Sequence, residues 1–233
     1  MPRRAIPIVT CRNCALYNTA RVLGLDSPDC STLDQVVIRN HPIERHQRLY
    51  SAGDAVRYLY LVHSGSFISH DQGQVMGFHL PGEIVGIEEI GETRHSHTAI
   101  ALENGSVCQL DFIHLEDSLE PDELIRVQRY LLQAAATHAR QLQQERLITG
   151  LPAAEQRIAA FLLNIGQRFQ SHGFPAFSYR LPMSREEIAS YLGLAPETVI
   201  RTLKKLESRG LVSVRTRQVE IHEPRALEQL SAA

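Results

Sequence analysis

The sequence predicts an α+β fold in which an N-terminal antiparallel β-barrel, one long helix and a C-terminal winged helix-turn-helix follow each other. Short apolar or alternating runs, separated by Gly, Pro, Asn and Asp, fill residues 40–120. Residues 122–147 contain no Gly or Pro, and two short helix signatures joined by a glycine follow. The expected units are a cysteine-bearing segment 1–39, a sensory barrel 40–120, a dimerisation helix 121–148 and a DNA-binding domain 149–233.

Composition restricts the class of protein. The chain has 233 residues, of which 43% are hydrophobic and 21% charged, as is ordinary for a soluble protein with one or two cores. It has no run of about 20 apolar residues that would span a membrane. Its start, MPRRAIPIVTCRNC, has no apolar run like that of a secretory signal. We therefore expect a cytoplasmic protein without a membrane partner.

Three of the four cysteines, Cys11, Cys14 and Cys30, crowd into the first thirty residues. The fourth, Cys108, lies in the strand-like run SVCQL. In a reducing cytoplasm such a cluster binds metal or senses redox state more often than it forms structural disulfides.

The barrel and the long helix are predicted from periodicity. The strand-like runs are RLYSAGD, YLYLVHSGSFI, VMGFHLPGEIV, HTAIAL and SVCQLDF. On the helix, a narrow seam with spacings of three and four residues predicts pairing with a second copy of the chain; packing inside its own subunit is the alternative. The seam consists of Leu124, Val127, Leu131, Ala134 and His138.

The last part of the chain carries the helix-turn-helix signals. Ser184 and Glu187 form a capping box that starts one helix. Gly193 breaks the chain, Pro196 suits the first position of a second helix, and Gly210 ends that helix. The run LVSVRTRQVEIH then predicts a hairpin wing with two arginines at its tip.

The second of these helices has the pattern of a DNA-reading helix. Val199, Leu203 and Leu206 should face the core, which turns a polar face outward. Its candidate DNA-binding residues are Glu197, Thr198, Ile200, Arg201 and Lys204. Glu197 can accept from cytosine N4, and Arg201 can donate to guanine O6 and N7; a simple salt bridge between them is the other interpretation. Residues 180–217 carry a formal charge of +4 in a chain of net charge −2, which favours contact with phosphates.

The order of these parts resembles the CRP/FNR family of bacterial transcription regulators. The stretches GFHLPGEIVGIEEIG, ALENGSVCQLDF, AAFLLN and SYLGLAPETVIR are similar to its oxygen-responsive FNR branch. The resemblance implies a cyclic-nucleotide-binding-like or cupin-like barrel, a homodimer on a palindromic double-stranded DNA operator, and contact with RNA polymerase. It also implies that Cys11, Cys14, Cys30 and Cys108 bind an oxygen-labile [4Fe-4S] cluster.

The sequence departs from the FNR pattern at two places. Fifteen residues separate Cys14 from Cys30, whereas FNR proteins usually keep the third cysteine within a few residues of the second. A zinc site or smaller cluster, or no metal, are the alternatives. Ile200 occupies a position where FNR proteins commonly have serine, so its base preference differs; a thymine methyl is a suitable contact.

The same architecture also allows two further functions, ligand sensing and catalysis. Cyclic-nucleotide sensing would use Glu88, but HSHTAIAL offers no arginine for the phosphate, and Arg94 is out of register. A metal-dependent cupin enzyme would use the barrel histidines, whose spacing is not that of a ligand set: His63, His70, His79, His95 and His97. We predict no enzyme. A regulator of the same family that senses nitric oxide, redox state or a small ligand remains the alternative to oxygen sensing.

Overall fold

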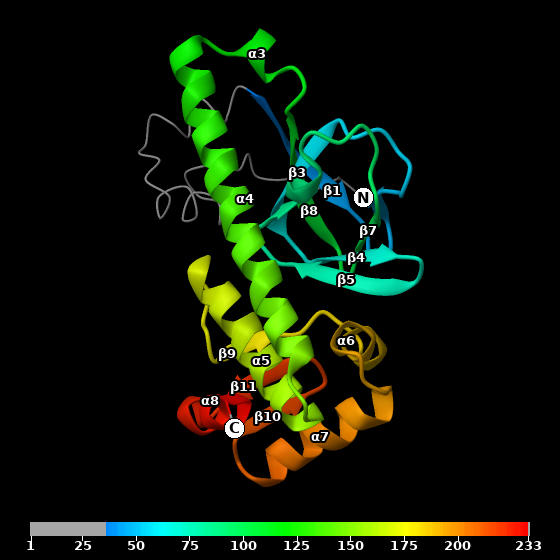
Figure 1. Ribbon diagram of the computed structural model, residues 1–233, viewed down its shortest axis with the longest axis vertical. Helices are drawn as coiled ribbons and strands as arrows, with labels where there is room; N and C mark the ends of the chain where they lie inside the picture. Colours follow the sequence, from blue (N-terminus) through cyan, green and yellow to red (C-terminus); the bar gives the residue numbers. More distant parts are fainter. Residues whose placement is uncertain (1–35, 233) are drawn as a thin grey trace, which may run out of the picture.

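The structure is a computed structural model that describes residues 36–232 (Figure 1). A β-barrel and a predominantly helical C-terminal domain lie at opposite ends, and one long helix runs beside both. No helix in the described residues is long and apolar enough to cross a membrane.

The barrel consists of two four-stranded antiparallel sheets, in the orders β1-β8-β3-β6 and β2-β7-β4-β5. An apolar core that includes Tyr60, Phe67 and Val107 fills the space between them. The predicted runs all form strands; β1 lies at the boundary of the predicted N-terminal segment and was not predicted. The strands are β1 Val37–Ile43, β2 Arg48–Tyr50, β3 Tyr58–Ser64, β4 Phe67–Asp71, β5 Gln74–His79, β6 Ile84–Val85, β7 Thr98–Ala101 and β8 Gly105–Asp111. A short helix, η2 (Ile87–Glu89), follows β6.

Helix α3 (Leu115–Ser118) leads into the long helix α4, which spans Pro121–Gly150 and so extends two residues past the predicted end. Pro121 stands at its N-terminus, where a missing N–H is tolerated. One face of α4 packs on the β1-β8-β3-β6 sheet through Val127, Tyr130 and Leu131. The opposite face is turned to solvent.

The C-terminal domain begins with helix α5 (Ala154–Ser171) and ends with α8 (Pro224–Ala232). Between them lie α6 (Arg185–Leu192) and α7 (Pro196–Ser208). A three-stranded sheet of order β10-β11-β9 completes the domain. Its strands are β9 Ser178–Arg180, β10 Val212–Arg215 and β11 Gln218–Ile221.

The barrel and the C-terminal domain share one hydrophobic core. Phe78 of β5 packs on Tyr191 of α6, with ring centroids 5.0 Å apart, and Tyr191 packs on Phe161 of α5 at 5.8 Å. The backbone N–H of Val75 donates to Ser190 Oγ at 3.2 Å. Since an interface between domains permits independent motion unless it is large and apolar, this core fixes the two units together.

A buried arginine connects all three parts of the fold. Arg168 of α5 donates from Nε and Nη2 to both carboxylate oxygens of Glu83 in the barrel, at 2.8 and 2.7 Å. Its Nη1 lies 3.5 Å from Glu145 Oε1 of α4. The three side chains are 7%, 8% and 12% exposed. In such a dry site the ion pairs are strong, and losing one partner is costly.

Candidate nucleic-acid interface and sensory cavity

The two-helix unit α6–α7 is built as the sequence predicts. Ser184 Oγ accepts from the N–H of Glu187 at 3.1 Å, and the Glu187 carboxylate accepts from the N–H of Ser184 at 2.6 Å. Gly193 has φ 63°, a left-handed conformation that other residues rarely adopt, and it ends α6. Pro196 then starts α7. The tight turn holds α7 at a fixed angle, which a reading helix requires.

Helix α7 has one buried and one exposed face. Val199, Leu203 and Leu206 are at most 4% exposed and pack into the shared core. The predicted reading residues lie opposite: Glu197, Ile200, Arg201 and Lys204 are exposed and Thr198 is half-buried. Within the described residues neither Glu197 nor Arg201 forms an ion pair, so the salt-bridge interpretation is not realised in this structure.

Other cationic side chains near α7 form ion pairs or hydrogen bonds with residues of the same chain. Lys205 and Arg209 both pair with Glu155 at the start of α5. In the wing, Arg217 donates to the carbonyl of Pro182 at 2.8 Å, whereas Arg215 is exposed beside the turn at Thr216, φ 58°. In the part of the chain that the structure describes, Arg201, Lys204 and Arg215 are therefore exposed cations of the α7 and wing surface without such an ion pair or hydrogen bond.

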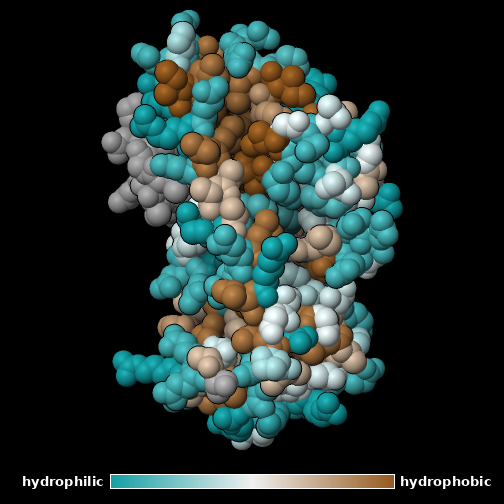
Figure 2. All heavy atoms as spheres, viewed as in Figure 1, coloured by the Kyte–Doolittle hydropathy of each residue, from teal (hydrophilic) through white to brown (hydrophobic). Residues whose placement is uncertain are grey.

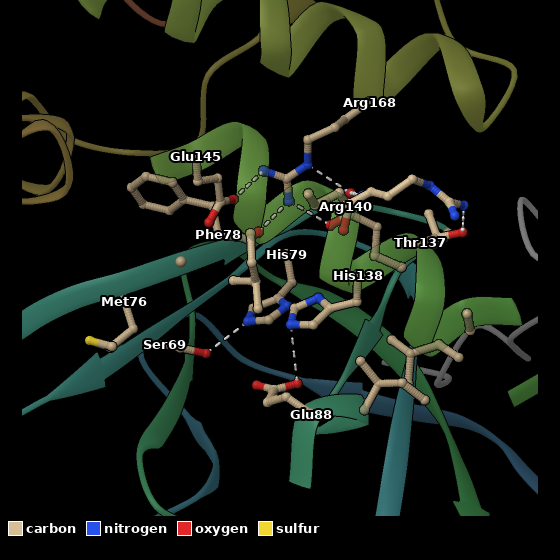
Figure 3. A pocket seen from close by; sticks show the side chains of 18 of the residues that line it. Ser69, Met76, Phe78, His79, Glu88, Thr137, His138, Arg140, Glu145 and Arg168 are labelled. Atoms are coloured by element: carbon tan, nitrogen blue, oxygen red, sulfur yellow. Dashed lines mark hydrogen bonds and ion pairs between the residues drawn. The ribbon is translucent and has the colours of Figure 1, made fainter. Parts of the chain in front are cut away.

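A second feature is a cavity of about 480 Å³ between the barrel, α4 and α5. His79 and His138 point into it from β5 and α4, and Glu88 lies beside them (Figure 3). His79 donates to or accepts from Ser69 Oγ at 2.7 Å, and its burial lowers its pKa to about 4. His138 Nε2 lies 3.7 Å from Glu88 Oε2 and so connects α4 to η2.

His97 lies at the wall of this cavity and is 9% exposed. Its Nε2 is 3.2 Å from Glu88 Oε1, and its Nδ1 is 3.1 Å from Glu89 Oε1. Burial alone would lower the pKa of His97, but hydrogen bonds to the two glutamates outweigh burial and raise it to about 9. Arg94 instead donates to the carbonyl of Gly53 at 2.7 Å and does not line the cavity. The barrel side thus offers Glu88 and a cationic histidine rather than the arginine a cyclic phosphate needs.

Cys108 is the one predicted cluster ligand inside the described residues; Cys11, Cys14 and Cys30 lie outside them. Cys108 is 6% exposed and belongs to the apolar cluster between the β8 face and α4. It lies opposite a register shift in β1, because Ile38 pairs with Gln109 and His41 with Val107. In the described part of the chain, no group of three His, Cys, Asp or Glu side chains could hold a metal ion.

The five residues of the predicted dimer seam on α4 are next to the barrel of the same chain. Val127 and Leu131 are 2% and 8% exposed, and Leu124 and Ala134 pack on the same intrachain cluster. His138, the fifth member, faces Glu88. All five therefore lie against the chain's own barrel. Helical periodicity identifies a face that is buried, and it does not say whether the covering surface belongs to the same chain.

Sequence reasoning missed Arg168, Glu83 and Glu145. Arg168 lies 85 positions from Glu83, and no local pattern marks a pair separated so widely. The sequence also gives no sign of the role of His97, because its contacts with Glu88 and Glu89 form only in the folded barrel.

A β-barrel, a ligand-sized cavity between that barrel, α4 and α5, and a helix-turn-helix with an exposed polar face together define a DNA-binding transcription regulator. Comparison with known families agrees: the cyclic nucleotide-binding domain matches residues 41–122 and the Crp-like helix-turn-helix domain matches residues 156–230. The chain belongs to the CRP/FNR family of transcription regulators, which are not enzymes.

The relatives are named as transcription regulators, and two of them, from Aggregatibacter actinomycetemcomitans and Haemophilus influenzae, are named anaerobic regulatory protein. The chain is 37% identical to the transcriptional activator protein Anr of Pseudomonas aeruginosa, over 94% of this chain and 91% of that protein. It is 32% identical to the fumarate and nitrate reduction regulatory protein of Escherichia coli K12, over 96% and 90%. Among solved structures, FixK2 from Bradyrhizobium japonicum matches with a TM-score of 0.73 and 30% identity, covering 84% of this chain and 98% of that one.

Proposed function

We propose that this chain is an oxygen-responsive, homodimeric regulator that binds a palindromic operator when Cys11, Cys14, Cys30 and Cys108 hold a [4Fe-4S] cluster. The observation that carries the proposal is the position of Cys108, buried beneath the long helix α4. A buried thiolate in apolar surroundings is unfavourable unless a metal binds it. The two relatives named anaerobic regulatory protein, 32% and 30% identical to this chain, support the same signal.

The course of β1 supports the four-cysteine set. Val37 pairs with Leu110, so the chain enters the barrel beside the strand that carries Cys108. Cys30 lies seven residues before Val37, a stretch that spans about 25 Å at most when extended. Cys30 is therefore within reach of Cys108 despite its long spacing from Cys14. Such a cluster, when bound, supplies an oxygen-labile crosslink between four thiolates.

The exposed face of α4 is the surface we propose for the second copy. Ile125, Leu132 and Leu147 are 53%, 72% and 66% exposed, and with Ala136 they fall on one side of the helix, opposite the barrel-facing residues. Hydrophobic side chains gather over the upper part of α4 (Figure 2). Cys108 lies under the buried face of the same helix. A cluster bound at Cys108 would order that buried face, and the exposed face of α4 would then be held in position for the second copy.

The test is to purify the protein without oxygen and compare it with a Cys108→Val variant, whose side chain fills nearly the same volume. The expected wild type is brown, contains about four irons and four sulfides per chain, and loses colour, dimer and operator binding in air. Cys108→Val should be colourless and monomeric with its fold intact. A colourless wild type that binds the operator equally in both atmospheres would contradict the proposal.

The same experiment separates the alternative, a regulator of this family that senses another signal. The 480 Å³ cavity lined by His79, Glu88 and His138 favours that alternative. Under this alternative, the colourless protein should still bind DNA, and its DNA binding should respond to a small ligand or to nitric oxide. Contact with RNA polymerase, implied by the family, stays a prediction.

A further inference from the structure

Two cations beside the exposed polar face of α7 share one carboxylate. Lys205 follows Lys204 along the helix, and Arg209 lies one turn further on. The side chains of Lys205 and Arg209 are 60% and 47% exposed. Lys205 Nζ pairs with one carboxylate oxygen of Glu155, and Arg209 Nη1 pairs with the other. The two cations are therefore accessible to solvent, and one anion partly neutralises both.

Glu155 belongs to a different helix, which holds it in place. It lies in the first turn of α5, where the helix dipole favours a negative charge, and its side chain is only 18% exposed. The hydrogen bond from Lys205 lowers the pKa of Glu155, so the carboxylate is ionised at neutral pH. If either cation moved to a DNA phosphate, it would have to leave Glu155, whose less neutralised charge would then lie close to the DNA.

The number of free cations on this surface affects random and specific DNA differently. Contacts with phosphates carry no sequence information, and they supply almost all of the affinity for random duplexes. Contacts of Glu197 and Arg201 with base edges, by contrast, require the right sequence in the groove. A further free cation beside α7 should therefore strengthen binding to random DNA more than it strengthens binding to an operator.

We propose that Glu155 is a specificity-determining residue that holds Lys205 and Arg209 against α5 and thereby restrains sequence-independent binding of DNA. Glu155 itself reads no base. It acts by reducing the attraction between the α7 surface and phosphates, so that base contacts account for a larger share of the binding. This inference rests on the proposed operator binding.

The experiment compares wild type with Glu155→Gln, which removes the charge and nearly keeps the shape of the side chain. Binding of the anaerobic proteins to a random duplex and to an operator selected from random duplexes is measured from about 50 to 200 mM salt. At the lowest salt, Glu155→Gln should bind the random duplex about 10-fold more tightly. The slope of log affinity against log salt should steepen by up to about 1.8 for each reader on the DNA, because two cations become free. The ratio of operator affinity to random-duplex affinity should fall about 3-fold or more.

Two further proteins serve as controls. Glu228→Gln removes the same charge from α8, where the side chain is exposed, and it should leave the salt slope and the affinity ratio unchanged. Adding Lys205→Gln and Arg209→Gln to Glu155→Gln should return the slope on the random duplex to that of wild type, since the freed cations are then gone.

The direction of the effect separates this role from a merely structural one. If Glu155 only fastened α7 to α5, its loss would loosen the reader and weaken binding to both duplexes, and that result would overturn the inference. An equal gain in Glu228→Gln, or a gain that persists without Lys205 and Arg209, would overturn it as well. If no palindrome is selected, the proposed operator binding is overturned, while the salt slopes on the random duplex still decide whether Glu155 restrains sequence-independent binding.

Discussion

At the residue scale, the barrel wall contains a charged histidine held by two carboxylates. His97 is within hydrogen-bond distance of Glu88 and Glu89, and its neighbour Tyr50 places its hydroxyl 2.8 Å from His97 Nε2. The side chain of His138 faces Glu88 from α4. The hydrogen bonds to both glutamates, which outweigh burial, keep the pKa of His97 near 9.

This raised pKa predicts a pH dependence of stability. Because the folded pKa lies above the ordinary 6.5, the stabilisation is complete below pH 6.5 and is lost as pH rises through 9. The difference in free energy of unfolding between wild type and His97→Gln should shrink by roughly 2 kcal/mol over this window. Urea unfolding of both iron-free proteins at pH 6 and pH 9 measures this difference. Groups that titrate equally in both proteins do not contribute to it. An equal difference at both pH values would show that His97 does not titrate there.

At the same scale, the sequence predicted the exposed positions of Glu197 and Arg201 on α7 but not the partners of His97. Glu197 and Arg201 are recognisable because they share one helix with a core-facing stripe, a local relation that periodicity reports. Tyr50 and His97 are 47 positions apart, and Glu88 and His138 are 50 positions apart. Only the folded chain brings such residues together.

At the element scale, α4 carries apolar side chains on two opposite faces. Its inner face belongs to the barrel core, and its outer face carries Ile125, Leu132 and Leu147. The sequence predicted the length of this helix almost to its end, because an uninterrupted run without Gly or Pro is a strong signal. It assigned the dimer to the inner face, because Leu124, Val127 and Leu131 form the more regular apolar stripe.

Adjacent leucines test this division. Leu132→Asp should place a charge at the proposed dimer contact and give a monomer, with the unfolding free energy of the monomer changed by no more than about 0.5 kcal/mol. Leu131→Ala should instead destabilise the fold by about 2–5 kcal/mol, since that side chain is buried. Anaerobic sedimentation and urea unfolding measure both quantities. A Leu132→Asp protein that remains dimeric would place the second copy on another surface.

At the scale of the whole molecule, the barrel, α4 and the C-terminal domain meet at Arg168. Its charge is balanced by Glu83 and Glu145 from the other two parts. The same boundary carries an exposed pair between Arg180, 59% exposed, and Glu103. Buried and exposed ion pairs thus cross one interface, and their energies should differ widely.

Arg168→Met should lower the free energy of unfolding by about 3–5 kcal/mol, because it leaves Glu83 buried without its cation. Adding Glu83→Gln should restore a substantial part of the loss, since the stranded charge is then gone. Arg180→Met is the matched control and should cost less than about 1 kcal/mol. Urea unfolding of the four proteins measures these effects. Equal losses for the two arginines would mean that the buried network does not hold the units together.

The shared core of Phe78, Phe161 and Tyr191 bears on how such regulators recombine. A chain whose sensor and reader are joined only by a linker can exchange either one by a cut in that linker. Here a cut after α4 would separate β5 from α6 and expose the aromatic rings on both sides. A chimera that receives a foreign sensor therefore needs a matching α6 surface as well, so the modular unit of this protein includes the first helix of its own reader.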